Sequence, residues 1–279
     1  MPTCYIVGAG DFTPRGFAPV PGDLVLAADG GYRALYSLGY MPDLLLGDFD
    51  SLGDLTLPPD LPVLRFPARK DDTDTGLALR HGLDRGYRDF ALYGCAGGRV
   101  DHLLANLQSM ARVSRLGAAI RLAAPEYDAW ALTGPAPDTS APSTPAPDAL
   151  EPHASASHAS GPAPHAPHTP APDASAPSTS APDAPAPSTP APDALAPDAP
   201  GALAPAAVLA LPPRPGGTLV SVFCHGDRAE GVTLTGLAYP LSDAALAGDF
   251  PLGVSNRRLE GQPATVSVRR GTLLIFQGA

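Results

Sequence analysis

Short apolar runs alternate with amphipathic stretches along residues 1–123. The runs are three to five residues long and are bounded mainly by Gly, Pro and Asp, so they predict buried strands. The predicted strands are Cys4–Val7, Leu24–Ala28, Leu44–Leu46, Pro62–Phe66, Phe90–Tyr93 and Ile120–Ala123. Helical spacing of apolar residues predicts helices over Tyr32–Leu38, Thr73–Leu83 and Asp101–Leu116. This alternation predicts an α/β domain over 1–123, with a mostly parallel sheet that has ligand-binding residues at the carboxyl ends of its strands.

After Gly216 the pattern changes to the two-residue alternation of half-buried strands, as in Thr265–Val268. The predicted strands are Thr218–Phe223, Gly231–Ala238, Ala264–Val268 and Thr272–Phe276. Turns are predicted between them at Gly226-Asp227 and at Arg270-Gly271. We therefore expect a second, all-β domain over 124–279.

A low-complexity segment, 134–206, interrupts this β domain. It holds 20 of the 36 prolines and seven acidic residues, and it has no Lys, Arg or aromatic residue. Such a composition cannot bury enough apolar surface to offset chain entropy, so we expect a disordered Pro/Ala-rich insert. Strands are predicted on both sides, at Tyr127–Leu132 and Ala207–Leu211, which places the insert at the tip of a hairpin. Its four histidines are irregularly spaced and favour a solvated linker over a metal site.

The net charge of −10 comes largely from this insert, because the rest of the chain holds 21 acidic and 18 basic residues. No basic excess remains to attract a phosphate backbone, so nucleic acid is not an expected partner. The chain start lacks the pattern of a signal peptide, and no apolar run approaches the ~20 residues of a membrane helix. Three widely separated cysteines fit reduced thiols. We expect a cytoplasmic protein with no membrane partner.

Two polar clusters follow predicted strands in the first half of the α/β domain. Asp29, Gly30 and Gly31 stand between a strand and a helix, where glycine lets backbone N–H groups approach a phosphate or ribose. An ordinary strand-to-helix turn uses the same residues. Asp48 and Asp50, two residues apart after Leu44–Leu46, are typical of a site for Mg²⁺, which prefers oxygen ligands. An Asx turn is the structural alternative.

Two further clusters open the second and third predicted helices. In the first, Lys70 and three nearby carboxylates precede or flank Thr73, and Thr73 and Asp74 suit a helix N-terminus. The carboxylates exceed what a cap requires and could bind a metal beside a phosphate-neutralising lysine.

In the other cluster, Gly97 and Gly98 precede Arg99, Asp101 and His102. Arg99 could bind phosphate bidentately, while Asp101 could simply cap the helix. Together the four clusters predict a Mg²⁺–nucleotide site.

In this order and at these separations, the motifs resemble those of the bacterial-type thiamine pyrophosphokinases. The match runs through ADGG, GDFDS, KDDTD and GGRVDH to Val254-Ser255-Asn256 and covers nearly all of the chain outside the insert. The resemblance implies an N-terminal nucleotide-binding domain, a C-terminal β-sandwich and a homodimer with thiamine sites between subunits. The implied reaction converts ATP and thiamine to thiamine diphosphate and AMP.

The same resemblance implies roles for individual residues. Mg²⁺ ligands are expected at Asp48, Asp50 and Asp74, which with Asp101 are the expected catalytic residues. ATP contacts are expected at Asp29, Gly30, Gly31, Lys70, Thr73, Arg99 and His102, and thiamine contacts at Ser255 and Asn256. Arg257-Arg258 departs from the acidic or apolar pair usual after Ser-Asn, and the insert is absent from the family pattern.

Two other functions fit parts of the sequence. A sugar-nucleotide transferase would use Asp48-Phe49-Asp50 as a DxD metal motif, but it would leave KDDTD and GGRVDH unexplained. A non-catalytic protein could act through its proline-rich repeat, with the remaining residues as a scaffold.

Overall fold

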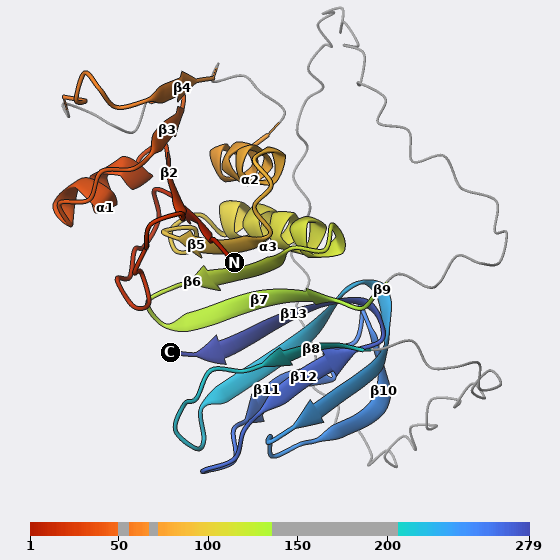
Figure 1. Ribbon diagram of the computed structural model, residues 1–279. Helices are drawn as coiled ribbons and strands as arrows, with labels where there is room; N and C mark the ends of the chain where they lie inside the picture. Colours follow the sequence, from red (N-terminus) through yellow and green to blue (C-terminus); the bar gives the residue numbers. More distant parts are fainter. Residues whose placement is uncertain (50–55, 67–71, 136–205) are drawn as a thin grey trace, which may run out of the picture. The chain divides into compact units, whose positions relative to one another are not determined.

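The structure is a computed structural model that describes residues 1–49, 56–66, 72–135 and 206–279. Its N-terminal half is a parallel sheet in the order β4-β3-β2-β1-β5-β6 (Figure 1). The strands are β1 (Cys4–Val7), β2 (Leu24–Ala28), β3 (Leu44–Gly47), β4 (Val63–Arg65), β5 (Asp89–Tyr93) and β6 (Ala119–Ala123). The helices are α1 (Gly31–Ser37), α2 (Asp74–Asp84) and α3 (Val100–Arg115). The predicted strands and helices of this half are confirmed, with ends that differ by no more than one residue.

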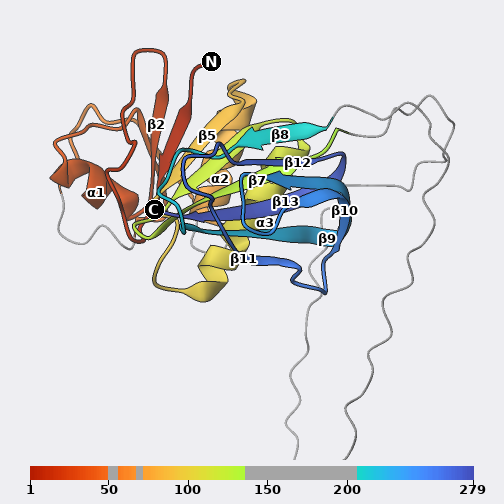
Figure 2. The same ribbon diagram turned by 90° about the horizontal axis from the view of Figure 1, so that it is seen from below.

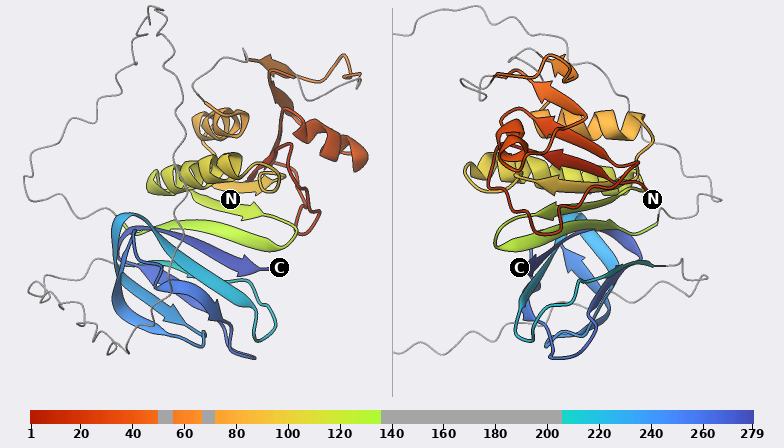
Figure 3. Two further views of the ribbon diagram at one scale, coloured as in Figure 1. Left: turned by 180° about the vertical axis from the view of Figure 1, so that it is seen from behind. Right: turned by 60° about the vertical axis from the view of Figure 1, so that its left-hand side comes forward.

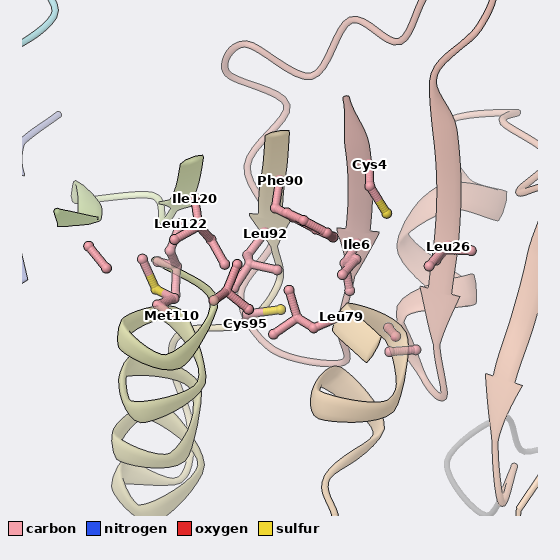
Figure 4. Close-up of a cluster of buried hydrophobic side chains, with 14 of the residues drawn as sticks. Cys4, Ile6, Leu26, Leu79, Phe90, Leu92, Cys95, Met110, Ile120 and Leu122 are labelled. Atoms are coloured by element: carbon pink, nitrogen blue, oxygen red, sulfur yellow. The ribbon is translucent and has the colours of Figure 1, made fainter. Parts of the chain in front are cut away.

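Successive residues of β1, β2, β3 and β5 enter two different cores, whereas the residues of the edge strand β4 are exposed. Ile6, Leu26 and Leu92 face α2 and α3, as the close-up in Figure 4 shows, and pack on Leu79 and Met110. The intervening residues face α1 and form a second core with it. Because both faces are covered, the strands are continuous apolar runs, and each buried Leu, Ile or Phe stabilises the fold by about 1.5–3 kcal/mol.

The parallel half continues directly into the antiparallel half. β7 (Tyr127–Thr133) pairs antiparallel with β6 on one side and with β13 (Arg270–Gly278) on the other (Figures 2 and 3). A single sheet thus joins the two halves, and α3 packs against it where β7 and β13 meet.

Two antiparallel layers form the C-terminal β-sandwich. β13, the first part of β9 (Leu219–Thr235) and β11 (Gly253–Arg257) extend the joining sheet. The second part of β9, with β10 (Leu241–Ala247), β12 (Thr265–Val268) and β8 (Ala207–Ala210), forms the other layer. Val222, Leu234, Val266 and Ile275 belong to the core between the layers.

The expectation of two strands separated by a turn at Gly226-Asp227 was wrong. Residues 219–235 form the single strand β9, which passes from one layer to the other (Figure 2). Gly226 and Gly231 both have positive φ, and the register with β13 shifts next to them. Glycine therefore serves here as the bend by which a strand changes sheets, not as a hairpin turn.

The hairpin expected on either side of the insert was also wrong. β7 pairs with β6 and β13, whereas β8 pairs with β12 in the other layer. β13, the last strand of the chain, takes the position next to β7 that a hairpin partner would occupy. The insert predicted for 134–206 lies outside the described residues, apart from its first two positions and its last.

Among the residues that the structure describes, no helix is long and apolar enough to cross a membrane.

Candidate active site

The strand order reverses at β1. The chain builds outward from β1 to β4 and then returns through α2 to add β5 on the other side of β1. In open parallel sheets, ligands bind at such a reversal, outside the carboxyl ends of the strands. The loops that follow β1 and β5 meet here. The Gly10 N–H donates to the Gly94 carbonyl (2.7 Å), and the Asp11 N–H donates to the Ala96 carbonyl (2.8 Å).

A cavity of about 270 Å³ lies between these loops and the helices behind them. It is lined by Gly8, Ala9, Gly10, Thr75, Gly94, Cys95, Ala96, Gly97, Gly98, Arg99, His102 and Asn106. Its volume is close to the lower end of the range for small-molecule sites, about 300–1,000 Å³. Of the expected ATP contacts, Arg99 and His102 are brought together in this cavity.

Glycine is required in the cavity wall because the two loops run so close together. A Cβ on Gly10 would lie 2.3 Å from the Ala96 carbonyl oxygen. A Cβ on Gly94, whose φ is +58°, would lie 2.4 Å from the Gly8 carbonyl oxygen. The wall is therefore bare backbone, which a phosphate or ribose can approach closely.

Buried polar contacts hold the back of the cavity. The Asn106 side chain donates from Nδ2 to the Cys95 carbonyl (2.8 Å), which ties α3 to the loop after β5. Burial raises the pKa of the Cys95 thiol to about 11, so the thiol stays protonated at neutral pH. Cys95 therefore acts by packing and not as a nucleophile.

The mouth of the cavity carries an exposed ion pair at the start of α3. Arg99 donates from Nε to Asp101 Oδ1 (3.1 Å) and from Nη2 to Asp101 Oδ2 (2.5 Å). This hydrogen bonding lowers the pKa of Asp101 and raises that of Arg99. Asp101 is thus ionised and orients a guanidinium that could bind phosphate bidentately.

Carboxylates follow the next two strands of the sheet. Asp29 follows β2 and is buried, with a positive φ of 46°. Its N–H donates to the Leu46 carbonyl (2.7 Å), and Gly47 lies against it, so the ends of β2 and β3 are in contact. Asp48 follows directly. The Asp29 Oδ1 atom is buried and has no hydrogen-bond partner among the described residues.

Gly30 and Gly31, expected to contact ATP, begin α1 beside this pair of carboxylates. A Cβ on Gly31 would lie 1.8 Å from the Val7 carbonyl oxygen. The requirement for glycine at this position therefore comes from the contact of α1 with β1.

The third predicted cluster lies at the N-terminus of α2. Thr73 is its N-cap, and Thr73 Oγ1 accepts a hydrogen bond from the Gly76 N–H (3.0 Å). Asp74 is in the first turn, and Asp72 pairs with Arg80. Thr75, which follows Asp74, lines the cavity, so the start of α2 borders the site.

Asp50 and Lys70 lie outside the described residues. In the parts of the chain that are described, no three His, Cys, Asp or Glu side chains converge to hold a metal ion. The predicted set of Asp48, Asp50 and Asp74 includes one of the residues outside that description, so it stays a prediction.

Ser255 and Asn256 lie on β11 in the β-sandwich and are not part of the cavity lining described above. The Asn256 amide is used within the fold, because it accepts from the Tyr239 N–H (2.9 Å) and donates to the Tyr239 carbonyl (2.7 Å). Ser255 is exposed, with a φ of +61°. Asn256 therefore shapes the surface on which Ser255 is presented.

The unusual pair after Asn256 has two separate roles. Arg258 is buried and donates to the Pro212 carbonyl (3.1 Å) and to Gln277 Oε1 (3.2 Å). Arg257 is exposed and donates to the Gly217 carbonyl (3.1 Å). Arg258 thus holds the sandwich together.

Several residues of the cavity were not singled out in the sequence, namely Gly8, Gly10 and Thr75. A signal was present, because Gly8-Ala9-Gly10 directly follows the first predicted strand. A Gly-x-Gly turn after the first strand of a parallel sheet is where phosphate binding is expected.

The first half of the chain is a parallel sheet with a glycine-walled cavity where its strand order reverses, and this sheet continues into a β-sandwich. The chain is thus an α/β protein in two parts, with a cavity of the kind in which nucleotides bind. Residues 21–122 match the family model described as "Thiamin pyrophosphokinase, catalytic domain". Residues 208–273 match the model described as "Thiamin pyrophosphokinase, vitamin B1 binding domain". Together the two models match more than half of the chain. The chain belongs to the thiamin pyrophosphokinase family.

A curated relative and solved structures agree with this assignment. The chain is 33% identical over 103 residues to thiamine pyrophosphokinase of Bacillus subtilis (strain 168), a match that spans 36% of this chain and 48% of that protein. The crystal structure of thiamine pyrophosphokinase from Bacillus subtilis has a TM-score of 0.65 at 19% identity and covers 99% of both chains. Yeast thiamin pyrophosphokinase has a TM-score of 0.56 at 10% identity, covering 100% of this chain and 86% of that one. At these identities the solved structures show a shared fold.

Proposed function

We propose that the protein transfers the pyrophosphoryl group of ATP to the hydroxyl of thiamine, giving thiamine diphosphate and AMP. The observation that carries this proposal is the cavity at the reversal point of the sheet, which lies largely within the region matched by the catalytic-domain model. The match of 208–273 to a vitamin B1 binding domain supports thiamine as the acceptor. The sugar-nucleotide transferase and the repeat-based interaction protein are not favoured, since neither accounts for both matches.

In the proposed reaction, the thiamine hydroxyl oxygen attacks the β-phosphorus of ATP. The new bond joins that oxygen to the β-phosphorus, and the bond to the oxygen bridging the α- and β-phosphorus breaks, so AMP leaves with the bridging oxygen. Such transfers depend mainly on positioning and on neutralisation of charge in the transition state. Arg99, oriented by Asp101, and the glycine amides of the cavity wall supply these effects on this chain, with Lys70 as a further expected cation.

We propose Asp48, Asp50 and Asp74 as the residues that hold Mg²⁺. Carboxylate oxygens are the donors that this cation prefers, and the buried, unpartnered Oδ1 of Asp29 beside Gly47 marks a place at this edge of the sheet suited to a positive charge. When bound, Mg²⁺ would neutralise the phosphate oxygens.

The hydroxyl proton passes to a carboxylate, for which Asp74 and Asp101 are the two candidates. Asp101 lies at the cavity mouth with its pKa lowered by Arg99, which makes it a weaker base than an ordinary aspartate. Asp74 lies at the start of α2, two residues along the chain from Asp72 and one from Thr75. The two candidates predict different effects of an Arg99 substitution on the pH dependence of activity.

We also propose a homodimer in which Ser255 and Asn256 of β11 contribute to the thiamine site. The outer face of neighbouring β9 carries apolar side chains, since Leu219 is 48% exposed and Phe223 is 37% exposed. A second copy of the chain that covers this face would bury them and bring Ser255 to a shared site. A Phe223→Glu variant should then shift the mass measured by light scattering from dimer to monomer, and an unchanged dimer would reject this face as the contact.

The three free thiols support a reducing, cytoplasmic location, which we propose as the place where the enzyme acts.

Product identification tests the proposed reaction. The purified full chain, incubated with ATP, Mg²⁺ and thiamine, should form AMP and thiamine diphosphate in equal amounts, measured by chromatography. ADP with thiamine monophosphate would overturn the proposal, as would the absence of any phosphorylated thiamine. An incubation without Mg²⁺ should form neither product, which tests the cation requirement separately.

A further inference from the structure

Asp128 on β7 is a buried carboxylate outside the cavity. Its side chain is 1% exposed, and its Oδ2 accepts from Arg15 Nη1 (2.5 Å) and from Arg214 Nη2 (3.1 Å). Its Oδ1 is buried with no hydrogen-bond partner among the described residues. Burying charges carries a desolvation penalty that often exceeds the attraction between them, so stability alone is a weak reason for this cluster.

One of the two arginines belongs to the loop that forms the cavity wall. Arg15 lies in the loop after β1, four residues beyond Asp11 and five beyond Gly10. Besides Asp128, its guanidinium donates from Nη2 to the Ala124 carbonyl (2.7 Å). Midway between β1 and β2, this loop is therefore attached to the junction between β6 and β7.

The near end of the same loop is attached to β5. The Gly8 N–H donates to the Tyr93 carbonyl (2.8 Å), and the Phe12 ring packs against the Tyr93 ring, with their centroids 5.8 Å apart. Residues 8–15 are thus held at both ends, and the cavity-lining residues 8–10 lie within that stretch. Of these two attachments, the one at Arg15 is an ion pair.

We propose that Asp128, acting through Arg15, is a positioning residue that holds the loop of residues 8–15 in the shape that binds the nucleotide phosphates. The identity of the ligand rests on the proposed function. The glycines of this wall have no side chains that could fix its shape by packing, so its shape depends on the backbone hydrogen bonds of Gly8, Gly10 and Asp11 and on the attachment of the loop at Arg15. Neither Asp128 nor Arg15 lines the cavity, so both act at a distance.

Arg214 provides a matched control. It donates to the same Asp128 oxygen, but it also donates from Nε to the Gly278 carbonyl (3.4 Å) and from Nη1 to Pro213 (3.3 Å), away from the loop. Arg15→Gln and Arg214→Gln each remove one guanidinium from the same carboxylate. Only the first detaches the cavity wall.

The experiment compares these two variants with the wild-type full chain. Arg15→Gln should raise the KM for ATP about tenfold or more while kcat and the KM for thiamine change less than about twofold, because misplaced binding groups weaken positioning. Hydrogen exchange without ligand should become faster over residues 8–11. Arg214→Gln should leave both the KM for ATP and this exchange unchanged. Asp128→Asn should change the KM for ATP and the hydrogen exchange in the same way as Arg15→Gln. If the Asp128→Asn protein does not fold, the comparison of Arg15→Gln with Arg214→Gln still tests the proposal.

Two results would overturn the proposal. One is an Arg15→Gln protein with a lower Tm but with unchanged KM for ATP and unchanged exchange at residues 8–11. The other is an equal rise of the KM for ATP in both arginine variants. If the wild type forms no thiamine diphosphate, the proposed function fails, and the exchange of residues 8–11 together with calorimetry of Mg²⁺–ATP binding still tests the role of Arg15.

Discussion

The two halves of this protein use their strands differently. In the central strands of the parallel half both faces are buried, one under α2 and α3 and the other under α1. In the antiparallel half the core lies between two layers, and the outer face of β9 leaves Leu219 and Phe223 exposed. A strand buried on both sides can offer chemistry only at its ends, whereas a strand with an open face can also offer its side chains to a ligand or partner.

The position of polar residues follows the same difference. In the parallel half, Asp29 and Asp48 lie just beyond strand ends, and Arg99 follows β5 as the N-cap residue of α3. In the antiparallel half, polar groups such as Asn256 and Arg258 lie within the fold and hold segments of backbone in place. Candidate catalytic groups therefore belong to the first half, whereas the polar groups of the second half mainly shape surfaces.

The largest expected effect concerns a strand-end carboxylate of the parallel half. Asp48→Asn removes a charge that we expect to act on the metal-bound phosphates, so turnover should fall by about 10²- to 10³-fold, as for other preorganised electrostatic groups. The Tm should stay within a few degrees of the wild type. A steady-state assay measures the turnover, and thermal unfolding measures the Tm. A lower Tm with activity retained per folded molecule would mean that Asp48 is structural.

A substitution in the doubly covered sheet should have the next largest effect. Leu26 in β2 is fully buried, so Leu26→Ala should lower the free energy of unfolding by about 2–5 kcal/mol through lost burial and a cavity. The matched change on the open half is Val208→Ala on β8, where the side chain is 63% exposed and the cost should stay within about 0.5 kcal/mol. Denaturant unfolding measures both, and similar costs would contradict the difference between the halves.

The two ion pairs attached to the site should respond differently to salt and to charge removal. The exposed Arg99–Asp101 pair lowers the pKa of Asp101, so Arg99→Gln should raise that pKa toward its ordinary value of about 3.9. Asp101 would then gain its proton at a higher pH than in the wild type and stay ionised over a narrower pH range. Carbon NMR titration of Asp101 measures the shift, and 1 M salt should produce part of it in the wild type.

The pH profile of the Arg99→Gln protein also separates the two candidate bases. If Asp101 accepts the thiamine proton, the acid limb of kcat/KM should move to higher pH with the variant. If Asp74 accepts it, the limb should stay where it is. The Arg15–Asp128 pair provides the contrast, because its carboxylate is buried and salt should weaken it less than the exposed Arg99–Asp101 pair.

The smallest expected effect is a difference in thiol reactivity between the two halves. Burial raises the pKa of Cys4 to about 12 and that of Cys95 to about 11, so both stay protonated at pH 8. Cys224 in β9 is partly exposed, and its pKa is raised by burial and by Asp227. Iodoacetamide at pH 8 should therefore modify Cys224 slowly, and Cys4 and Cys95 only after unfolding. Mass spectrometry of the peptides measures this, and modification of Cys95 in the folded protein would show that the cavity opens.

Local pattern predicted the parallel half well because its strands are short and mostly apolar, and because the helices after β2, β4 and β5 have clear periodicity. The antiparallel half was harder to predict. β10 has the sequence LSDAALA, whose small and polar residues carry little strand signal, and it forms because β9 offers it a partner. Gly226 looked like a turn residue, since the same positive φ serves a hairpin turn and a bend within one long strand.

Short-range preferences along the chain specify the alternation of strands and helices in the first half, the β-rich second half, and the motifs that place Asp29, Asp48, Thr73 and Arg99 after strands or at helix starts. Three further features arise on folding: the loops after β1 and β5 meet in a glycine-walled cavity, β13 joins the two halves beside β7, and Asp128 binds Arg15 and Arg214. Those contacts join residues far apart along the chain, and pairing across the sheet depends on which partners the whole fold brings together.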